Sequence, residues 1–162
     1  MKLSVTLDQK RILSSGAAVT ALAAGRRWGK SITQAFWLVK MAVENPGGTC
    51  WYVSLSYARA LKQMRVMSKS VGFMRLVKHV YAQFPPRFEL WNGSEICFRS
   101  LDRPDNLLGD GLVAIALDEA ARVPEIIWRQ YLLPMLADTR GRALVVSTFN
   151  GKDWFWELVQ RG

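Results

Sequence analysis

Residues 24–31 read Ala-Gly-Arg-Arg-Trp-Gly-Lys-Ser, and this segment limits the possible folds of the chain more than any other. A loop that wraps a polyphosphate needs backbone N–H groups that all point inward, and glycine gives the backbone that freedom. The segment follows an apolar run at residues 18–23, typical of a buried strand, and precedes helical periodicity over residues 31–44. This order predicts a phosphate-binding loop (P-loop). The alternative is a basic turn that matches the pattern by coincidence, since Ala24 stands where the strict pattern has glycine.

In a P-loop, two side chains at the start of the helix carry the chemistry. We expect the Lys30 ammonium to reach the β- and γ-phosphates of ATP, and the Ser31 hydroxyl to ligate Mg²⁺. The positive N-terminal end of the helix adds to the attraction for phosphate.

A pair of acidic residues, Asp118 and Glu119, follows the apolar run at residues 113–117. Ligands of open α/β sheets bind at the carboxyl ends of the strands, which is where this pair would lie. We expect Asp118 to hold the Mg²⁺ shell and Glu119 to orient or deprotonate the attacking water. The alternative is two exposed acids at the end of a strand.

Strand and helix patterns alternate along the rest of the chain. Further strands are expected at residues 49–55 and 143–147, and a hairpin over residues 88–101 that turns at Asn92-Gly93. Helices are expected from an N-cap at Ser56 to about residue 70, from 125 to 133 after Pro124, and after Asp153. The alternation predicts an α/β fold in three layers around a mostly parallel central sheet. We expect residues 1–162 to form a single P-loop ATPase domain.

Composition points to a folded protein inside the cell. Half of the residues are hydrophobic and 22% are charged, and no apolar run approaches the roughly 20 residues needed to span a membrane. The first residues lack the apolar stretch of a signal peptide. Cys50 and Cys97 lie in apolar, strand-like contexts, so we expect buried thiols. His79 is the only histidine and is not a candidate for a metal site.

The net charge of +9 is concentrated in the first half of the chain, where residues 1–79 carry 13 Lys/Arg and 2 Asp/Glu. Residues 59–78 contain no acid. At about 100° per residue, four basic side chains there share one side of a helix, opposite an apolar side. These are Arg59, Lys62, Arg65 and Lys69, opposite Leu61, Met64, Met67 and Val71. The stripe suggests contact with the phosphates of DNA, without base readout. The alternative is a solvated surface helix.

Three motifs together resemble the ATPase domain of the large terminase subunits of tailed bacteriophages, which are DNA-packaging motors. They are the Walker A segment at residues 25–31, the Walker B segment at 117–121, and Ser-Thr-Phe-Asn-Gly at 147–151. The resemblance extends over nearly the whole chain, in the correct order. The family accepts a small residue in place of the first P-loop glycine, which accounts for Ala24. The fold implied is a P-loop NTPase of the additional-strand, catalytic-glutamate type.

The resemblance also implies roles for single residues. Arg26 matches an arginine that contacts the γ-phosphate within the same subunit, and Gln9 resembles a glutamine that reads adenine. Ser147 and Thr148 resemble a coupling motif that links hydrolysis to domain movement, although the family usually has proline where this chain has Phe149. The nucleotide-binding set is then Gln9, Gly25, Arg26, Arg27, Trp28, Gly29, Lys30 and Ser31.

The implied function is ATP hydrolysis with Mg²⁺ that drives double-stranded DNA into a procapsid in the host cytoplasm. Implied partners are the portal protein, the small terminase subunit and further copies in a ring, whereas the isolated chain would be a monomer. Full-length family members continue into a nuclease domain of ribonuclease H type that residues 1–162 lack, so we expect this chain to be one part of a longer product. The family often has Asn-Leu-Arg-Gly before Walker B, and Leu108 replaces that arginine, which acts on a neighbouring subunit. Arg103 is the nearest other candidate, unless it pairs with Asp102 or Asp105.

Two other classes remain open from the sequence. A helicase-like DNA-dependent ATPase shares these motifs but needs a second similar domain. An ATP-gated DNA-binding or assembly module would hydrolyse negligibly, and Glu119 argues against it. Turnover measured with and without DNA distinguishes the module from the motor.

Overall fold

The structure is a computed structural model, which describes residues 6–102, 107 and 111–161. Its centre is a seven-stranded sheet with the strand order β1-β7-β6-β2-β5-β4-β3. The pairs β1–β7, β7–β6, β6–β2 and β2–β5 are parallel, whereas β4 is antiparallel to both β5 and β3. The strands are β1 (Val19–Ala23), β2 (Thr49–Ser54), β3 (Val77–Tyr81), β4 (Arg87–Leu90), β5 (Glu95–Ser100), β6 (Ala114–Asp118) and β7 (Arg142–Ser147). The predicted α/β fold with a mostly parallel sheet is confirmed.

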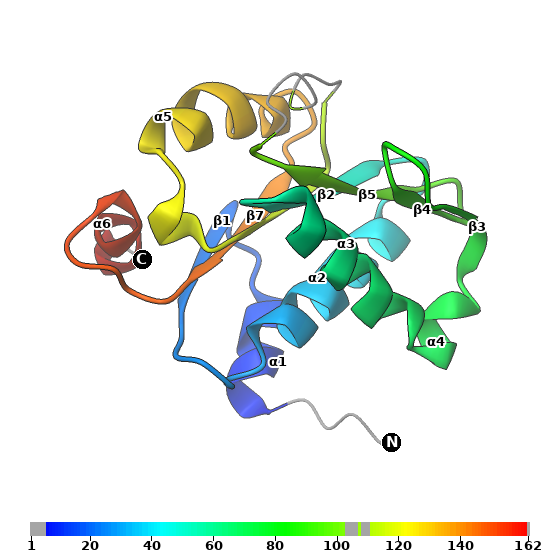
Figure 1. Cartoon of the computed structure of the whole chain (residues 1–162), viewed down its shortest axis with the longest axis horizontal. Coiled ribbons are helices and arrows are strands. Elements are labelled where there is room, and N and C mark those ends of the chain that lie inside the picture. Colours follow the sequence, from blue (N-terminus) through cyan, green and yellow to red (C-terminus); the bar gives the residue numbers. More distant parts are fainter. Residues whose placement is uncertain (1–5, 103–106, 108–110, 162) are drawn as a thin grey trace.

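Helices cover both faces of this sheet and bury a separate apolar core on each (Figure 1). One face carries α1 (Leu7–Ser14), α2 (Lys30–Glu44), α3 (Tyr57–Ser68) and α4 (Val71–Met74). The other carries α5 (Glu125–Ile127), a π-helical turn over Trp128–Leu132, a 3-10 turn over Pro134–Leu136, and α6 (Trp154–Arg161). Side chains that alternate along β6 divide between the two cores, with Ala114 and Ala116 under α2 and with Ile115 and Leu117 under the α5 segment.

The predicted hairpin is confirmed as β4–β5, and its turn is fixed by short-range bonds. Gly93 adopts φ +81°, which favours glycine. The Asn92 Oδ1 atom accepts from Ser94 N at 3.1 Å, and its Nδ2 donates to the Ala42 carbonyl at 2.9 Å. The hairpin is therefore tied to the end of α2.

The predicted start of α3 is confirmed, but its cap differs from the prediction. Ser56 occupies the N-cap position without a side-chain capping bond, and the Asp102 carboxylate accepts the Tyr57 N–H at 3.1 Å instead. The helix ends at Ser68, so Val71 does not belong to its apolar side. Val71 begins α4 and is 71% exposed, which makes that part of the predicted stripe wrong.

Two further expectations are confirmed by burial and capping. Cys50 and Cys97 are free, buried thiols on β2 and β5. The Asp153 carboxylate accepts from Trp156 N at 2.9 Å at the start of α6. Within the described ranges, no helix combines the length and the apolar character required to cross a membrane.

Candidate functional site

The loop between β1 and α2 has the backbone geometry that its glycines predict. Gly29, directly before α2, adopts φ +94°, and an added Cβ there would lie 2.9 Å from the Gln9 Nε2 atom. A side chain at this position would therefore be strained and would displace Gln9. Because α2 begins at Lys30, directly after the loop, its positive N-terminal end lies at the loop.

The Lys30 ammonium ties this loop to the end of β7. Its Nζ donates to the carbonyls of Ala24 at 2.7 Å and Gly25 at 2.8 Å, and to the Thr148 hydroxyl at 3.3 Å. The Ala24 N–H also donates to the Ser147 carbonyl at 3.1 Å. The P-loop and the residues after β7 thus form one hydrogen-bonded unit.

The two predicted coupling residues make different contacts. The Ser147 hydroxyl is buried, accepts from Ala121 N at 3.2 Å and donates to the Thr148 carbonyl at 3.0 Å. The Thr148 hydroxyl is exposed and contacts Lys30 and the Ala24 carbonyl, the latter at 3.3 Å. Ser147 therefore holds the turn that follows Glu119, whereas Thr148 meets the P-loop.

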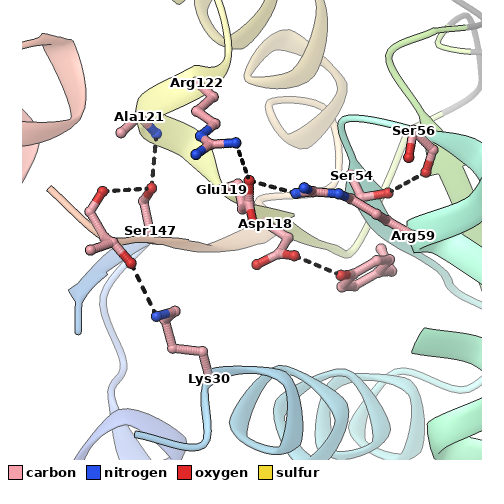
Figure 2. Close-up of polar contacts among 11 residues, drawn as sticks. Lys30, Ser54, Ser56, Arg59, Asp118, Glu119, Ala121, Arg122 and Ser147 are labelled. Carbon is pink, nitrogen blue, oxygen red and sulfur yellow. Dashed lines mark hydrogen bonds and ion pairs between the residues drawn. The ribbon is translucent and has the colours of Figure 1, made fainter. Parts of the chain in front are cut away.

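The acidic pair lies opposite Lys30, and its two carboxylates have different partners (Figure 2). Asp118 ends β6, and its Oδ2 accepts the Tyr52 hydroxyl at 3.0 Å. Glu119 follows with φ +52°, and its Oε2 contacts Arg59 Nη1 at 2.5 Å and Arg122 Nη1 at 3.6 Å. Glu119 thus has a left-handed backbone conformation, and its carboxylate contacts arginines whereas that of Asp118 contacts a tyrosine.

Burial dominates the electrostatics of Asp118. It raises the pKa of the Asp118 carboxyl, although the hydrogen bond from Tyr52 acts in the opposite direction. Burial and the Asp118 charge together raise the pKa of the Tyr52 hydroxyl. The hydrogen bond to Glu119 raises the pKa of the Arg59 guanidinium. Tyr52 therefore remains a neutral donor to Asp118, and Arg59 remains a cation at Glu119.

These groups line a pocket of about 360 Å³ at the carboxyl end of the sheet. Its lining residues are Arg26, Lys30, Ser31, Asp118, Glu119, Arg122, Ser147, Thr148, Phe149 and Asn150. The structure thus brings together the predicted lysine, serine, carboxylates, coupling pair and Arg26 from three segments of the chain. Oxygen ligands from Ser31 and Asp118 fit Mg²⁺. Among the described residues no group of three or more His, Cys, Asp and Glu could hold a metal, so an ion here would share its shell with phosphate and water.

Five residues of the predicted nucleotide-binding set do not line the pocket, namely Gln9, Gly25, Arg27, Trp28 and Gly29. Gln9 is buried in α1, where its Oε1 accepts Thr6 N at 2.9 Å in a capping box, and its Nε2 lies against Gly29. Trp28 packs against the core on the α2 face. Arg27 is exposed, with φ +67°.

Three parts of the site were not predicted from the sequence. They are Tyr52, Arg122 and the contact of Arg59 with Glu119. Arg122 lies three residues after Glu119, and this spacing was a usable signal. Tyr52 and Arg59 reach the carboxylates through the pairing of β2 with β6 and the packing of α3, which no local pattern encodes. Of the predicted basic stripe, Lys62, Arg65 and Lys69 are exposed, and Lys69 is the C-cap of α3. Leu108 and Arg103 lie outside the described residues.

Comparisons with known proteins show which proteins this chain is similar to. The family model described as "Terminase large subunit, T4likevirus-type, N-terminal" matches residues 21–161. A large terminase subunit of Thermus phage G20c is 30% identical over 156 residues, and the match covers 85% of this chain. The chain spans 32% of the length of that relative.

Two solved structures share the fold. The large terminase ATPase domain of Thermus phage P74-26 has a TM-score of 0.78 and 30% identity, over 92% of this chain and 66% of that chain. The large terminase of bacteriophage HK97 also has a TM-score of 0.78, at 16% identity, over 98% of this chain and 37% of that one. The second likeness concerns the fold alone.

Proposed function

Since the chain belongs to the T4-like family of terminase large subunits and matches their N-terminal region, we propose that it is a Mg²⁺-dependent ATPase that drives double-stranded DNA into a viral procapsid. Residues 1–162 would form its single ATPase domain. The observation that carries the proposal is the pocket in which a P-loop lysine faces two carboxylates with different partners.

Each side chain of the pocket has a role that its position supports. Lys30 would exchange the carbonyls of Ala24 and Gly25 for β- and γ-phosphate oxygens. The Ser31 hydroxyl and the Asp118 carboxylate would hold Mg²⁺, which neutralises developing charge on the phosphates when it is bound. Arg26, which lines the pocket, would reach the γ-phosphate from within the same subunit.

Glu119 would orient the attacking water or accept its proton. Its Oε2 atom is shared by Arg59 and Arg122, so the carboxylate has to release an arginine before this oxygen can take a water. Thr148 would respond to the presence or absence of the γ-phosphate. Its hydroxyl accepts a hydrogen bond from Lys30, and it follows Ser147, whose hydroxyl holds the turn after Glu119.

The proposed partners are those of a packaging motor of this family. The chain would bind duplex DNA through Lys62, Arg65 and Lys69, while Arg59 serves Glu119 in this structure. In the host cytoplasm it would act in a ring of copies on the portal protein, together with the small terminase subunit, and be a monomer in isolation.

Phosphate release from ATP tests the ATPase assignment. We expect the isolated chain to turn over ATP slowly in Mg²⁺ and not in EDTA, because charge on the γ-phosphate is normally offset by a further arginine that a neighbour supplies, which contributes about 10³–10⁵ in rate. Duplex DNA should raise the rate. If ATP binds with Mg²⁺ and DNA present but no phosphate is released, the chain is an ATP-gated binding module.

Reversal of three charges tests the DNA surface. A variant that combines Lys62→Glu, Arg65→Glu and Lys69→Glu should bind duplex DNA of any sequence more weakly. Basic side chains that neutralise phosphates release counterions from the DNA, and this variant loses that contribution to binding. The slope of log affinity against log salt should flatten by about one unit for each phosphate that is no longer neutralised. Fluorescence anisotropy across a salt titration measures both effects. The matched control replaces Lys10, Arg140 and Lys152 with glutamate, so its net charge changes by the same amount as that of the stripe variant. Equal slopes in the two variants would show that the stripe is only a solvated surface.

A further inference from the structure

Tyr52 is a buried phenol that touches the candidate site through one hydrogen bond. Its side chain is 2% exposed, and its hydroxyl donates to the Asp118 Oδ2 atom at 3.0 Å. The ring packs against Phe98, with centroids 5.9 Å apart. The hydroxyl is thus held on a rigid ring and cannot follow Asp118 if the carboxylate moves.

The sheet itself aims this hydroxyl at Asp118. Strands β2 and β6 are parallel neighbours, with Tyr52 in register with Ala116. Since side chains alternate along a strand, Asp118 shares the face of Ala116, which is the face that α2 covers. Tyr52, Asp118 and the start of α2, with Ser31, therefore gather on one side of the sheet.

The Tyr52 hydroxyl is a neutral donor to one oxygen of the Asp118 carboxylate, so it can orient this carboxylate without neutralising it. The bond to Oδ2 restricts the rotation of the Asp118 side chain, which lines the pocket together with Ser31 and Lys30. A lysine or arginine in the same place would neutralise the carboxylate, and its charge would compete with a cation. A phenol orients Asp118 without this competition.

We propose that Tyr52 is a positioning residue that fixes the Asp118 carboxylate in the orientation that receives Mg²⁺ with ATP; this inference rests on the proposed function. Tyr52 does not touch the nucleotide or the reacting atoms. Its effect should be on the affinity for the metal, since removal of a partner that orients a metal ligand typically costs about 10–100-fold in metal affinity.

The test removes the hydroxyl alone. Tyr52→Phe keeps the ring against Phe98 and deletes the bond to Asp118. Tyr81→Phe is the matched control, because the Tyr81 hydroxyl donates to the Glu89 Oε2 atom at 3.1 Å on the exposed strand β3. Each variant removes a phenol hydroxyl that bonds to a carboxylate, and only one of the two hydroxyls lies at the site.

Mn²⁺ is the probe, and the paramagnetic resonance signal of free Mn²⁺ reports its binding with a non-hydrolysable ATP analogue. We expect Tyr52→Phe to lower the Mn²⁺ affinity by about 10-fold and Tyr81→Phe to leave it unchanged. The affinity for a fluorescent ADP analogue in EDTA should be the same in all three proteins. In the hydrolysis assay, high Mg²⁺ should restore most of the rate of Tyr52→Phe.

Three outcomes would overturn the inference. Equal Mn²⁺ affinity in Tyr52→Phe and the parent would show that the hydroxyl does not position Asp118. A parallel decrease of nucleotide affinity in EDTA would show general damage to the pocket. If the parent itself binds no Mn²⁺ with the analogue, the proposed function fails as well, and this result is distinct from the other two.

Discussion

Replacing Glu119 with glutamine is expected to slow ATP hydrolysis by about 10²-fold or more and to leave ATP binding intact. Glutamine keeps the shape of the side chain but cannot accept a proton from water and holds a water less strongly. Glu119 follows the strand that ends in Asp118, and its carboxylate lines the pocket opposite Lys30 (Figure 2). Phosphate release measures the rate, and a fluorescent ATP analogue measures the affinity.

Glu125→Gln is the matched control for this change. Glu125 also pairs with an arginine, since its Oε1 lies 2.5 Å from Arg129 Nε, but on the surface of α5. The control should hydrolyse ATP at the parent rate. If Glu119→Gln does so too, another group must activate the water, and our assignment of the catalytic carboxylate is wrong.

Replacing Lys30 with alanine is expected to affect both binding and catalysis. The ammonium would contact phosphate oxygens in the bound state and at the transition state, so its removal should weaken ATP binding as well as slow hydrolysis. Removal of a single group that stabilises transition-state charge costs about 10²–10³ in rate. The change also removes the bonds to Ala24, Gly25 and Thr148 that join the P-loop to the end of β7.

Lys40→Ala controls for the removal of a lysine from the same helix. The Lys40 ammonium pairs with Glu44 at 3.0 Å near the end of α2, away from the pocket. Calorimetric titration with Mg·ATP should show weaker binding for Lys30→Ala and parent-like binding for Lys40→Ala. Equal affinities in the two variants would remove Lys30 from the nucleotide site.

The elements that build the pocket could be predicted because their signals are local. The apolar run of β6 ends in Asp118, the run of β1 ends at the P-loop, and both strands lie where the patterns place them. The turn at Asn92-Gly93 likewise depends on a residue that tolerates positive φ. Patterns of this kind depend only on neighbours in the sequence, so they predict elements and their ends.

Contacts between elements could not be predicted in this way. From the sequence, Arg59 could be part of a solvated stripe or a partner for Glu119. Only the packing of α3 on β2 and β5, which brings Arg59 to Glu119, decides between these two roles. The cap of α3 comes from Asp102, far along the chain, instead of from Ser56. Strand β3 was not predicted either, because four of its five side chains are exposed and it lacks the apolar alternation of a half-buried strand.

The order of strands also sets when the P-loop can form during synthesis. Among the strands that the structure describes, β1 lies at the edge of the sheet and pairs with β7 alone, so Val19 pairs with Ala143 from far along the sequence. Closing so long a loop costs chain entropy before any contact compensates for it, and such topologies fold slowly. On the ribosome, β1 would therefore wait for β7, its partner in the described sheet, to emerge. Between the synthesis of Lys30 and that of Ser147, the nascent chain would therefore carry its proposed phosphate-binding residues without the neighbouring strand that shapes the loop, and we expect competence for nucleotide only once translation has passed Ser147.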